Sequence, residues 1–393
     1  MKIKFLFISV GFLILVGCVR SVFRSWPLPF FYVGLMAVGF LLALQFSLRS
    51  NFARVFVLNL MALPLAVSVA EGGLYLLHKL ISTPQTRFEQ DGDFVHGNYW
   101  LEDNELGYRP RPSGSYSAIM RERKTSQPVY NVRYGIDDEG LRKTYPSDAV
   151  SAKSCVVFFG CSFTFGEGLS DEESLPYLFG KDMGSTVKVY NLGFHGYGPH
   201  QMLAAIESGK IKKLLQNCEN KPITAYFTTA RFHIPRVAGK TFWDKSGPWY
   251  EVQGDHLTRR GQFSDLKYHF WGFKLSPTLE YQLEKSLTYG KLRTLASSKD
   301  EGLYLAIVKK SATDFANLFP KSQFKVIVWP TLADHNQKAD NALVEKISQL
   351  GLSVTNVESI LPDLRTHSAR YELPDSHPSF EANRSIASFL SQH

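Results

Sequence analysis

The sequence predicts an α/β fold with a parallel β-sheet, preceded by an N-terminal membrane anchor. From about residue 154, short apolar runs alternate with longer segments whose apolar residues recur at helical spacing, which is typical of a parallel sheet covered on both faces. Residues 1–80 instead contain three long apolar stretches. The chain has 393 residues, 44% hydrophobic and 20% charged, which excludes wholesale disorder and is ample for a sizeable core.

The anchor is predicted at residues 1–80, with two to three transmembrane segments at about 5–23, 28–46 and 55–77. A membrane-spanning helix needs about 20 apolar residues. The first segment follows Met-Lys-Ile-Lys and also resembles a signal peptide, so it is either retained or cleaved. A lipoprotein-like box ending at Cys18 leaves lipidation there open as well. Glu71 is expected near the lipid headgroups.

The charge distribution does not by itself orient the anchor. In a three-span model, Lys and Arg residues near the segments are equally numerous on the two sides. The export-signal character of the N-terminus favours a C-terminal domain outside the cytoplasm. The net charge of +8 suits an anionic partner or membrane surface. No Lys/Arg block or RNA-binding signature occurs, so no nucleic-acid partner is expected.

The four cysteines, Cys18, Cys155, Cys161 and Cys218, form no CxxC pair, so a structural zinc site is not expected. Both Cys155 and Cys218 adjoin predicted strands. Buried free thiols are the expected state, and a Cys155–Cys218 disulfide is the alternative for an exported domain.

Residues 81–150 are turn-rich and are expected to form an extended lead-in to the 151–393 domain. Helix 171–183 begins with acidic residues, as a helix N-terminus prefers. Around residues 236–298 an aromatic-rich insertion interrupts the alternation, over one end of the sheet. The predicted strands are 155–159, 187–193, 223–229 and 324–330, and the helices are 171–183, 200–216, 304–319, 343–351 and 379–392.

A candidate nucleophile, Ser162, follows the first predicted strand. Ligands of a parallel sheet bind beyond the carboxyl ends of its strands, and Gly160 and Gly166 allow a tight turn there. A serine hydroxyl needs a base within hydrogen-bond reach, itself oriented by a third group. Asp375 and His377, on a proline-bracketed loop before the last helix, can supply both.

Three stretches carry a family resemblance: GCSFTFGEGLSDEESLP (160–176), NLGFHGYGPHQM (191–202) and PDSHPSFEANRSIA (374–387). They resemble sequence blocks of SGNH hydrolases, the GDSL-type esterase superfamily. The resemblance covers about residues 150–393 and implies a flavodoxin-like three-layer α/β/α sandwich. It implies Ser162 as nucleophile, His377 as base and Asp375 as its support, with an oxyanion hole formed by the N–H groups of Ser162 and Gly196.

The sequence departs from the family pattern at three places. Cys161 replaces the usual Asp before the serine, and Asp-x-His replaces Asp-x-x-His. The family's third-block asparagine is missing after strand 223–229, so Thr229 or His233 is the expected third oxyanion donor, with His233 slightly favoured. Arg236 is a further candidate, and with Trp249 and Tyr250 it is a weaker candidate for substrate contact. His195 and His200 are expected to be loop hydrogen-bonders, and no metal or cofactor is expected.

Together these features predict a membrane-anchored serine esterase of the SGNH type. Its substrates are expected to be acyl, notably acetyl, esters of a cell-surface glycan or lipid, and polysaccharide-modification proteins are candidate partners. The expected location is a bacterial inner membrane, with the C-terminal domain in the periplasm or outside. An O-acyltransferase with the same triad is one alternative. A non-catalytic glycan-binding or assembly protein is another, favoured by the missing asparagine and by Cys161.

Overall fold

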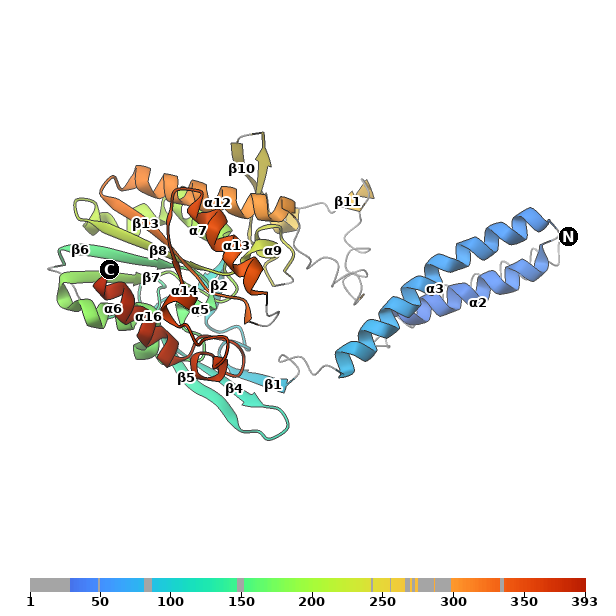
Figure 1. The fold of residues 1–393 in the computed structure, drawn as a ribbon, viewed down its shortest axis with the longest axis horizontal. Coiled ribbons are helices and arrows are strands. Elements are labelled where there is room, and N and C mark those ends of the chain that lie inside the picture. Colours follow the sequence, from blue (N-terminus) through green and yellow to red (C-terminus); the bar gives the residue numbers. More distant parts are fainter. Residues whose placement is uncertain are drawn as a thin grey trace. The chain divides into compact units, whose positions relative to one another are not determined.

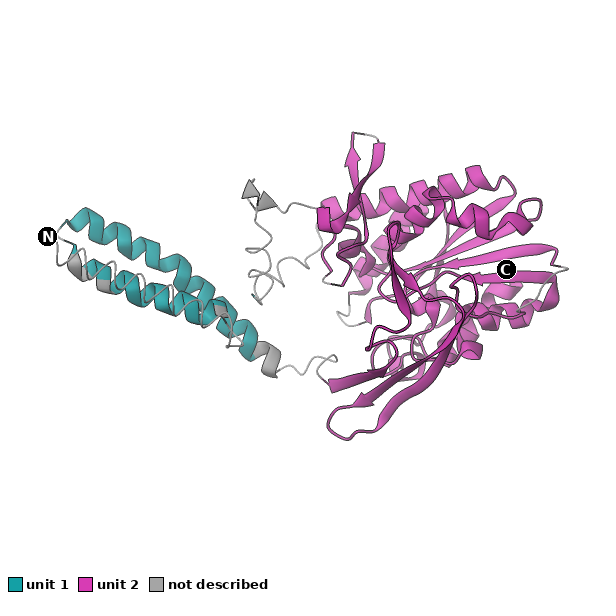
Figure 2. Ribbon diagram, turned by 180° about the vertical axis from the view of Figure 1, so that it is seen from behind, with its two compact units in different colours: residues 1–83, 267–295 teal, residues 84–266, 296–393 magenta. Residues whose placement is uncertain are grey.

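The structure is a computed structural model. It describes residues 29–48, 50–80, 87–146, 152–241, 243–254, 256–265, 269–270, 273–274, 286, 298–332 and 336–393. The chain divides into two compact units, which Figure 2 colours separately. The first comprises Met1–Thr83 and Lys267–Leu295, and the second comprises Pro84–Leu266 and Ala296–His393. The predicted insertion at 236–298 is therefore divided between the two units.

Two apolar helices, α2 (Pro29–Ser47) and α3 (Asn51–Leu80), pack side by side in the first unit (Figure 1). In α3 the segment Asn51–Leu76 has a mean hydropathy of 1.9, and it is the one helix of the described residues long and apolar enough to cross a membrane. The apolar part of α2, Phe30–Leu42, is shorter. The predicted segment 5–23 lies outside the described residues.

Close contact between the two helices depends on small residues. The hydroxyl of Ser68 donates to the carbonyl oxygens of Pro64 and Phe31, 3.0 Å each, and a Cβ at Gly34 would meet that hydroxyl at 2.0 Å. Glu71 is only 1% exposed and accepts a hydrogen bond from Ser286. This carboxylate is therefore buried within the unit; its position near the lipid headgroups stays a prediction.

A five-stranded parallel sheet forms the centre of the second unit, in the order β14-β13-β8-β6-β7. Numbered 1 to 5 along the chain and read from the β7 edge, the strands have the flavodoxin-like order 2-1-3-4-5. The chain starts at β6 and adds strands first on one side and then on the other, so the switch point of the topology lies between β6 and β8. The predicted fold class is confirmed. The strands are β6 (Ser154–Phe159), β7 (Val187–Asn191), β8 (Ile223–Thr229), β13 (Ser322–Val328) and β14 (Ser353–Asn356).

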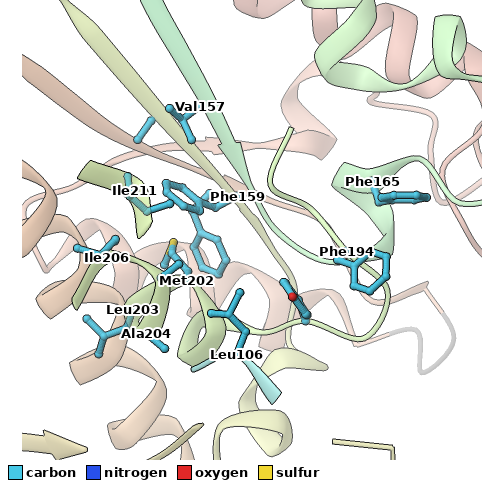
Figure 3. Packing of buried hydrophobic residues seen from close by; sticks show 14 of the residues in the cluster. Leu106, Val157, Phe159, Phe165, Phe194, Met202, Leu203, Ala204, Ile206 and Ile211 are labelled. Carbon is cyan, nitrogen blue, oxygen red and sulfur yellow. The ribbon is translucent and has the colours of Figure 1, made fainter. Parts of the chain in front are cut away.

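Helices cover both faces of this sheet, and its strands β6 and β8 are buried on both sides. Val157 and Phe159 of β6 pack toward α7 (Pro199–Glu207) and α12 (Ser298–Leu318), and Figure 3 shows Phe159 beside Met202. The intervening Val156 and Phe158 pack toward α6 (Leu175–Met183) and α16 (Phe380–Gln392) on the other face (Figure 1). Further helices are α5 (Ser162–Phe165), α8 (Lys210–Leu214), α9 (His233–Val237), α13 (Gln337–Ser348), α14 (Val357–Ile360) and α15 (Ser368–Tyr371).

Two of the differences from the sequence prediction have a clear local cause. The helix expected at 200–216 is broken into α7 and α8, because Gly209 adopts a left-handed conformation (φ 77°) between them. Strand β14 was not predicted, since Ser-Val-Thr-Asn contains no apolar run.

The lead-in is an antiparallel sheet of β1 (Phe88–Gly92), β4 (Gly114–Glu122) and β5 (Pro128–Ile136). Arg142 pairs with both Ile136 and Asn191, and so connects this sheet to the edge strand β7. Two hairpins accompany the lead-in and the part of the insertion that stays in this unit: β2 (Trp100–Asp103) with β3 (Gly107–Pro110), and β9 (Pro248–Gln253) with β10 (His256–Gln262).

Cys155 and Cys218 form a disulfide, with Cα atoms 6.1 Å apart. The expectation of free thiols is therefore wrong for this pair. The sequence could not establish the pairing because the two residues are 63 positions apart and meet only once β6 and β8 lie side by side. Cys161 is a buried free thiol.

Candidate active site

Ser162 is placed at the carboxyl end of β6, at the position where the strand order reverses. It begins α5, a single helical turn in which Gly166 and Glu167 both donate their N–H groups to the Ser162 carbonyl. Gly160 is required because a Cβ there would meet Thr164 Oγ1 at 2.2 Å. The turn therefore holds Ser162, which is 7% exposed, at the edge of the sheet where ligands of such folds bind.

His377 reaches Ser162 from a short hairpin. The hairpin is closed by a bridge between Glu372 and Pro378 and by the Leu373 N–H, which donates to the His377 carbonyl at 2.7 Å. His377 Nε2 lies 3.0 Å from Ser162 Oγ, and His377 Nδ1 lies 2.9 Å from Asp375 Oδ2. The structure thus brings the three residues predicted from the sequence into one hydrogen-bonded chain.

A second carboxylate, Glu167, faces the same imidazole. Its Oε2 lies 3.3 Å from His377 Nε2 and 2.5 Å from His195 Nδ1. Burial would raise the pKa of Glu167, but the charges of His377 and His195 and the His195 hydrogen bond lower it to about 2. Sequence reasoning missed this residue. The available signal was a lone charge between Gly166 and Gly168 in an otherwise uncharged turn.

The charge state of His377 reflects both carboxylates. Burial disfavours the imidazolium, but the negative charge of Glu167 and the hydrogen bond and charge of Asp375 outweigh it and raise the pKa of His377 to about 9. Arg236 opposes this rise. His377 is therefore protonated in the resting protein at neutral pH.

Arg142 fixes the turn that carries Ser162 and Glu167. Its guanidinium is buried and donates to the carbonyl oxygens of Phe165, Gly166 and Leu169, each at 2.6 Å, while Nε bonds Asp171 at 3.1 Å. A buried guanidinium satisfied in this way holds several backbone groups in one geometry. Sequence reasoning did not identify Arg142, because its partners, three backbone carbonyls and the Asp171 carboxylate, are distant in sequence.

Gly196 packs against two aromatic side chains. It has a φ of 72°, and a Cβ there would meet Trp243 Nε1 at 2.4 Å and the Tyr108 hydroxyl at 2.7 Å. The Tyr108 hydroxyl donates to the His195 carbonyl at 2.6 Å. Only glycine therefore fits between these side chains. Its N–H as an oxyanion donor remains a proposal.

Thr229 and His233, the expected third donors, bond to each other. Thr229 Oγ1 lies 2.9 Å from His233 Nδ1 and 2.8 Å from the Tyr304 hydroxyl, and all three side chains are buried. Burial lowers the pKa of His233 well below its usual value, so this ring is neutral. These contacts give both residues a place in the core and do not connect them to the triad.

The other residues proposed from the sequence differ in exposure and in their contacts. Arg236 Nη1 donates to the Tyr197 carbonyl at 2.6 Å, and its guanidinium lies over the rings of Phe232 and Trp243. Tyr250 is 1% exposed and its hydroxyl donates to Glu207 at 2.7 Å, which argues against substrate contact. Trp249 is half-buried beside it on β9. His200 is fully buried, with Nε2 2.7 Å from Asp244 Oδ2.

Two further features are a metal-type spacing of side chains within the site and a cleft elsewhere in the unit. Glu167, Asp375 and His377 place ligand-type atoms within 4.8 Å of one another, a spacing that a metal ion can occupy. Each of these side chains already has a protein partner: Glu167 contacts His195, and Asp375 and His377 contact each other.

A cleft of about 1820 Å³ runs between the lead-in and β7, and Ser162 and His377 are not among its lining residues.

Comparison with known proteins gives fold-level similarity only. No family model matches the chain, and no curated protein matches it. Among solved structures, a lipolytic G-D-S-L family protein from Veillonella parvula is similar at 12% identity and a TM-score of 0.34, over 60% of this chain and 94% of that one. A carbohydrate acetylesterase from Sinorhizobium meliloti is similar at 11% identity and 0.32, over 61% and 97%.

An acetyl xylan esterase from Butyrivibrio proteoclasticus is similar at 9% identity and a TM-score of 0.32, over 75% of this chain and 84% of that one. In fold, then, the chain is similar to lipolytic G-D-S-L proteins and carbohydrate acetylesterases. Because the TM-scores are below 0.5, these similarities carry no argument about substrate or mechanism, for which the geometry of Ser162, His377 and Asp375 is the evidence.

Proposed function

We propose that this protein is a membrane-anchored serine esterase that cleaves acyl esters, notably acetyl esters of a glycan, through an acyl-Ser162 intermediate. The observation that carries the proposal is the chain Ser162 Oγ, His377 Nε2, His377 Nδ1, Asp375 Oδ2, with links of 3.0 and 2.9 Å. A hydroxyl, an imidazole and a carboxylate in this order are the parts that serine catalysis requires.

In the proposed reaction, neutral His377 accepts the Ser162 proton at Nε2 while Ser162 Oγ bonds the ester carbonyl carbon. Asp375 keeps the proton on Nδ1 and stabilises the imidazolium. The imidazolium then gives its Nε2 proton to the leaving alcohol as the ester C–O bond breaks. Water attacks the acyl-serine with His377 again as base, and the acid leaves.

The developing oxyanion is assigned to the backbone N–H groups of Ser162 and Gly196. Ser162 is the first residue of α5, so its N–H lacks an intrahelical partner. Removing one such donor typically costs about 2.7–4 kcal/mol of transition-state stabilisation. The third donor stays unassigned, since Thr229 and His233 bond to each other.

Arg236 and Trp243 are the proposed contacts for the alcohol part of the substrate. Trp243 is 43% exposed, and its Nε1 donates to the Gly196 carbonyl at 3.4 Å, which places the indole beside the proposed oxyanion hole. No ion-pair partner of Arg236 occurs among the residues that the structure describes. A planar guanidinium next to an exposed indole suits a sugar ring that carries a carboxylate.

Export and membrane attachment are supported by two features. The apolar α3 helix is long enough to serve as an anchor, and disulfides such as Cys155–Cys218 persist in oxidising compartments. We therefore place the catalytic domain in the periplasm or outside the cell, with its substrate near the membrane surface. Polysaccharide-modification proteins are proposed partners.

The test is ester turnover by the full-length protein in detergent, using an acetylated neutral sugar and an acetylated uronic acid. Ser162→Ala and His377→Ala are each expected to lose roughly three or more orders of magnitude in kcat. Matched controls outside the triad, the half-buried Ser391→Ala and the exposed His367→Ala, should retain wild-type rates. An acceptor sugar that becomes acetylated would identify a transferase with the same acyl-enzyme. Equal rates for wild type and triad variants would overturn the proposal.

A further inference from the structure

Glu167 contacts the nitrogen of His377 that takes part in the reaction. His377 Nε2 has two neighbours, Ser162 Oγ at 3.0 Å and Glu167 Oε2 at 3.3 Å. Asp375 instead contacts Nδ1 on the far side of the ring. The imidazole is therefore held between two carboxylates, while a triad as such requires only the one at Nδ1.

The surrounding structure holds Glu167 in this position. Its carboxylate is bonded to His195 Nδ1 at 2.5 Å, and its side chain is 9% exposed. The Tyr134 hydroxyl accepts the N–H of the next residue, Gly168, at 2.9 Å. Five aromatic rings surround His195, with centroids 4.5–5.9 Å away: Phe94, Tyr99, Tyr134, Phe165 and Phe194. Glu167 is thus a preorganised buried charge and not a surface acid that happens to approach the site.

The charged groups around His377 come from three segments. Asp375 and Glu372 belong to its own hairpin, Glu167 follows α5, and Arg236 comes from α9. Burial raises the pKa of Glu372 to about 7, so this carboxyl is only partly ionised at neutral pH. The carboxylates in contact with the ring are therefore Asp375 at Nδ1 and Glu167 at Nε2.

We propose that Glu167 is a fourth catalytic residue, which shares the Nε2 proton of His377 with Ser162 and stabilises the imidazolium both at rest and in the transition state. This inference builds on the proposed esterase mechanism. In the resting protein the Nε2 proton is donated to Glu167, and the base form arises when that proton leaves to solvent. Ser162 then supplies the next proton to Nε2. Glu167 stabilises it there until it passes to the leaving alcohol, and Glu167 itself ends unprotonated.

The proposal predicts two kinetic effects of removing the Glu167 charge: the pH at which kcat/KM rises should fall, and the highest kcat/KM should also fall. With a pKa of about 9, only about one His377 in a hundred is neutral at pH 7, so kcat/KM should rise with pH up to about 9. In Glu167→Gln the acidic limb should move down by at least about one unit, because an opposite charge at this distance shifts a pKa by roughly 1–3 units. The alkaline plateau of that variant should fall about tenfold or more, because the imidazolium in the transition state loses a charged partner.

The deciding experiment titrates His377 directly by NMR in full-length protein labelled with ¹⁵N-histidine, with its signals assigned by their loss in His377→Gln. The pKa of His377 should fall by at least about one unit in Glu167→Gln and by less in Glu167→Asp, which keeps the charge. The matched control is Glu372→Gln. Glu372 is a nearby carboxyl that makes no hydrogen bond to the imidazole, so its removal should change the pKa of His377 by only a few tenths of a unit. Kinetic pH profiles of kcat/KM should follow the same order.

The outcomes separate this inference from the proposed function. If the pKa of His377 is the same in wild type, Glu167→Gln and Glu167→Asp, the inference is wrong, whatever the esterase activity. If the pKa falls and the kinetic limb follows it, both stand. If the pKa falls but no ester is turned over, the coupling of Glu167 to His377 stands and its role in the esterase mechanism is refuted.

Discussion

Removal of the Cys155–Cys218 disulfide should cost a large part of the stability of the catalytic domain. The bond joins the start of β6 to the segment just before β8, and it closes a loop of 63 residues. In the chain-entropy model, a cross-link between residues 63 positions apart lowers the entropy of the unfolded chain. This raises the free energy of unfolding by about 4 kcal/mol. That is a large fraction of the roughly 5–15 kcal/mol that stabilises a typical domain.

The assay is urea unfolding of the full-length protein in detergent, followed by tryptophan fluorescence with and without reductant. Reduction should lower the free energy of unfolding of the wild type by about 4 kcal/mol, and it should leave a Cys155→Ala/Cys218→Ala double variant unchanged. The buried Cys161 is present in both proteins and serves as an internal control. A change below about 1 kcal/mol on reduction, or thiol alkylation of both cysteines without reductant, would refute the reasoning.

Three further outcomes are expected. Arg142→Met should lower the free energy of unfolding by about 3–5 kcal/mol in the same urea assay and reduce ester turnover, because three backbone carbonyls and Asp171 lose a buried partner; an unchanged midpoint contradicts this. For Arg236→Met we compare kcat/KM for an acetylated uronic acid with kcat/KM for a neutral sugar ester. The preference for the uronic acid should fall about tenfold or more in Arg236→Met and should not change in the control Arg260→Met. An unchanged preference in Arg236→Met rules out the carboxylate contact. Dialysis against a chelator should leave turnover unchanged, because serine chemistry at Ser162 requires no metal; loss of turnover that Zn²⁺ or Mg²⁺ restores would place an ion among Glu167, Asp375 and His377.

The fold was predictable where local pattern and tertiary structure agree. Strand β8 occupies the predicted 223–229, and β6 and β7 differ from prediction only at their ends. The pattern succeeds in β6 and β8 because both faces of these strands are buried, so apolar runs mark them, and in β7 because every second residue is buried. β14 has only partly buried residues and no such run. The lead-in sheet depends on pairings between strands, and these do not show in the period of a single segment.

The site was predictable for the residues whose chemistry is visible in sequence. Ser162, Asp375 and His377 combine a reactive side chain with a turn or loop at a strand or helix boundary. Glu167 and Arg142 were missed because their roles come from what the fold brings to them: an imidazole from residue 377 and a row of carbonyls from residues 165–169. Tyr250 shows the reverse error, since an aromatic residue in an insertion looked available and is in fact core.

The central claim is that Ser162 is a nucleophile activated by His377. The most direct measurement is covalent labelling of the full-length protein with a fluorophosphonate, followed by peptide mass spectrometry, in wild type, Ser162→Ala and His377→Ala. We expect a single phosphonylated site at Ser162 in the wild type, no label in Ser162→Ala, and strongly slowed labelling in His377→Ala. A wild-type protein in which Ser162 remains unlabelled, or which is labelled there as fast without His377, would contradict the claim.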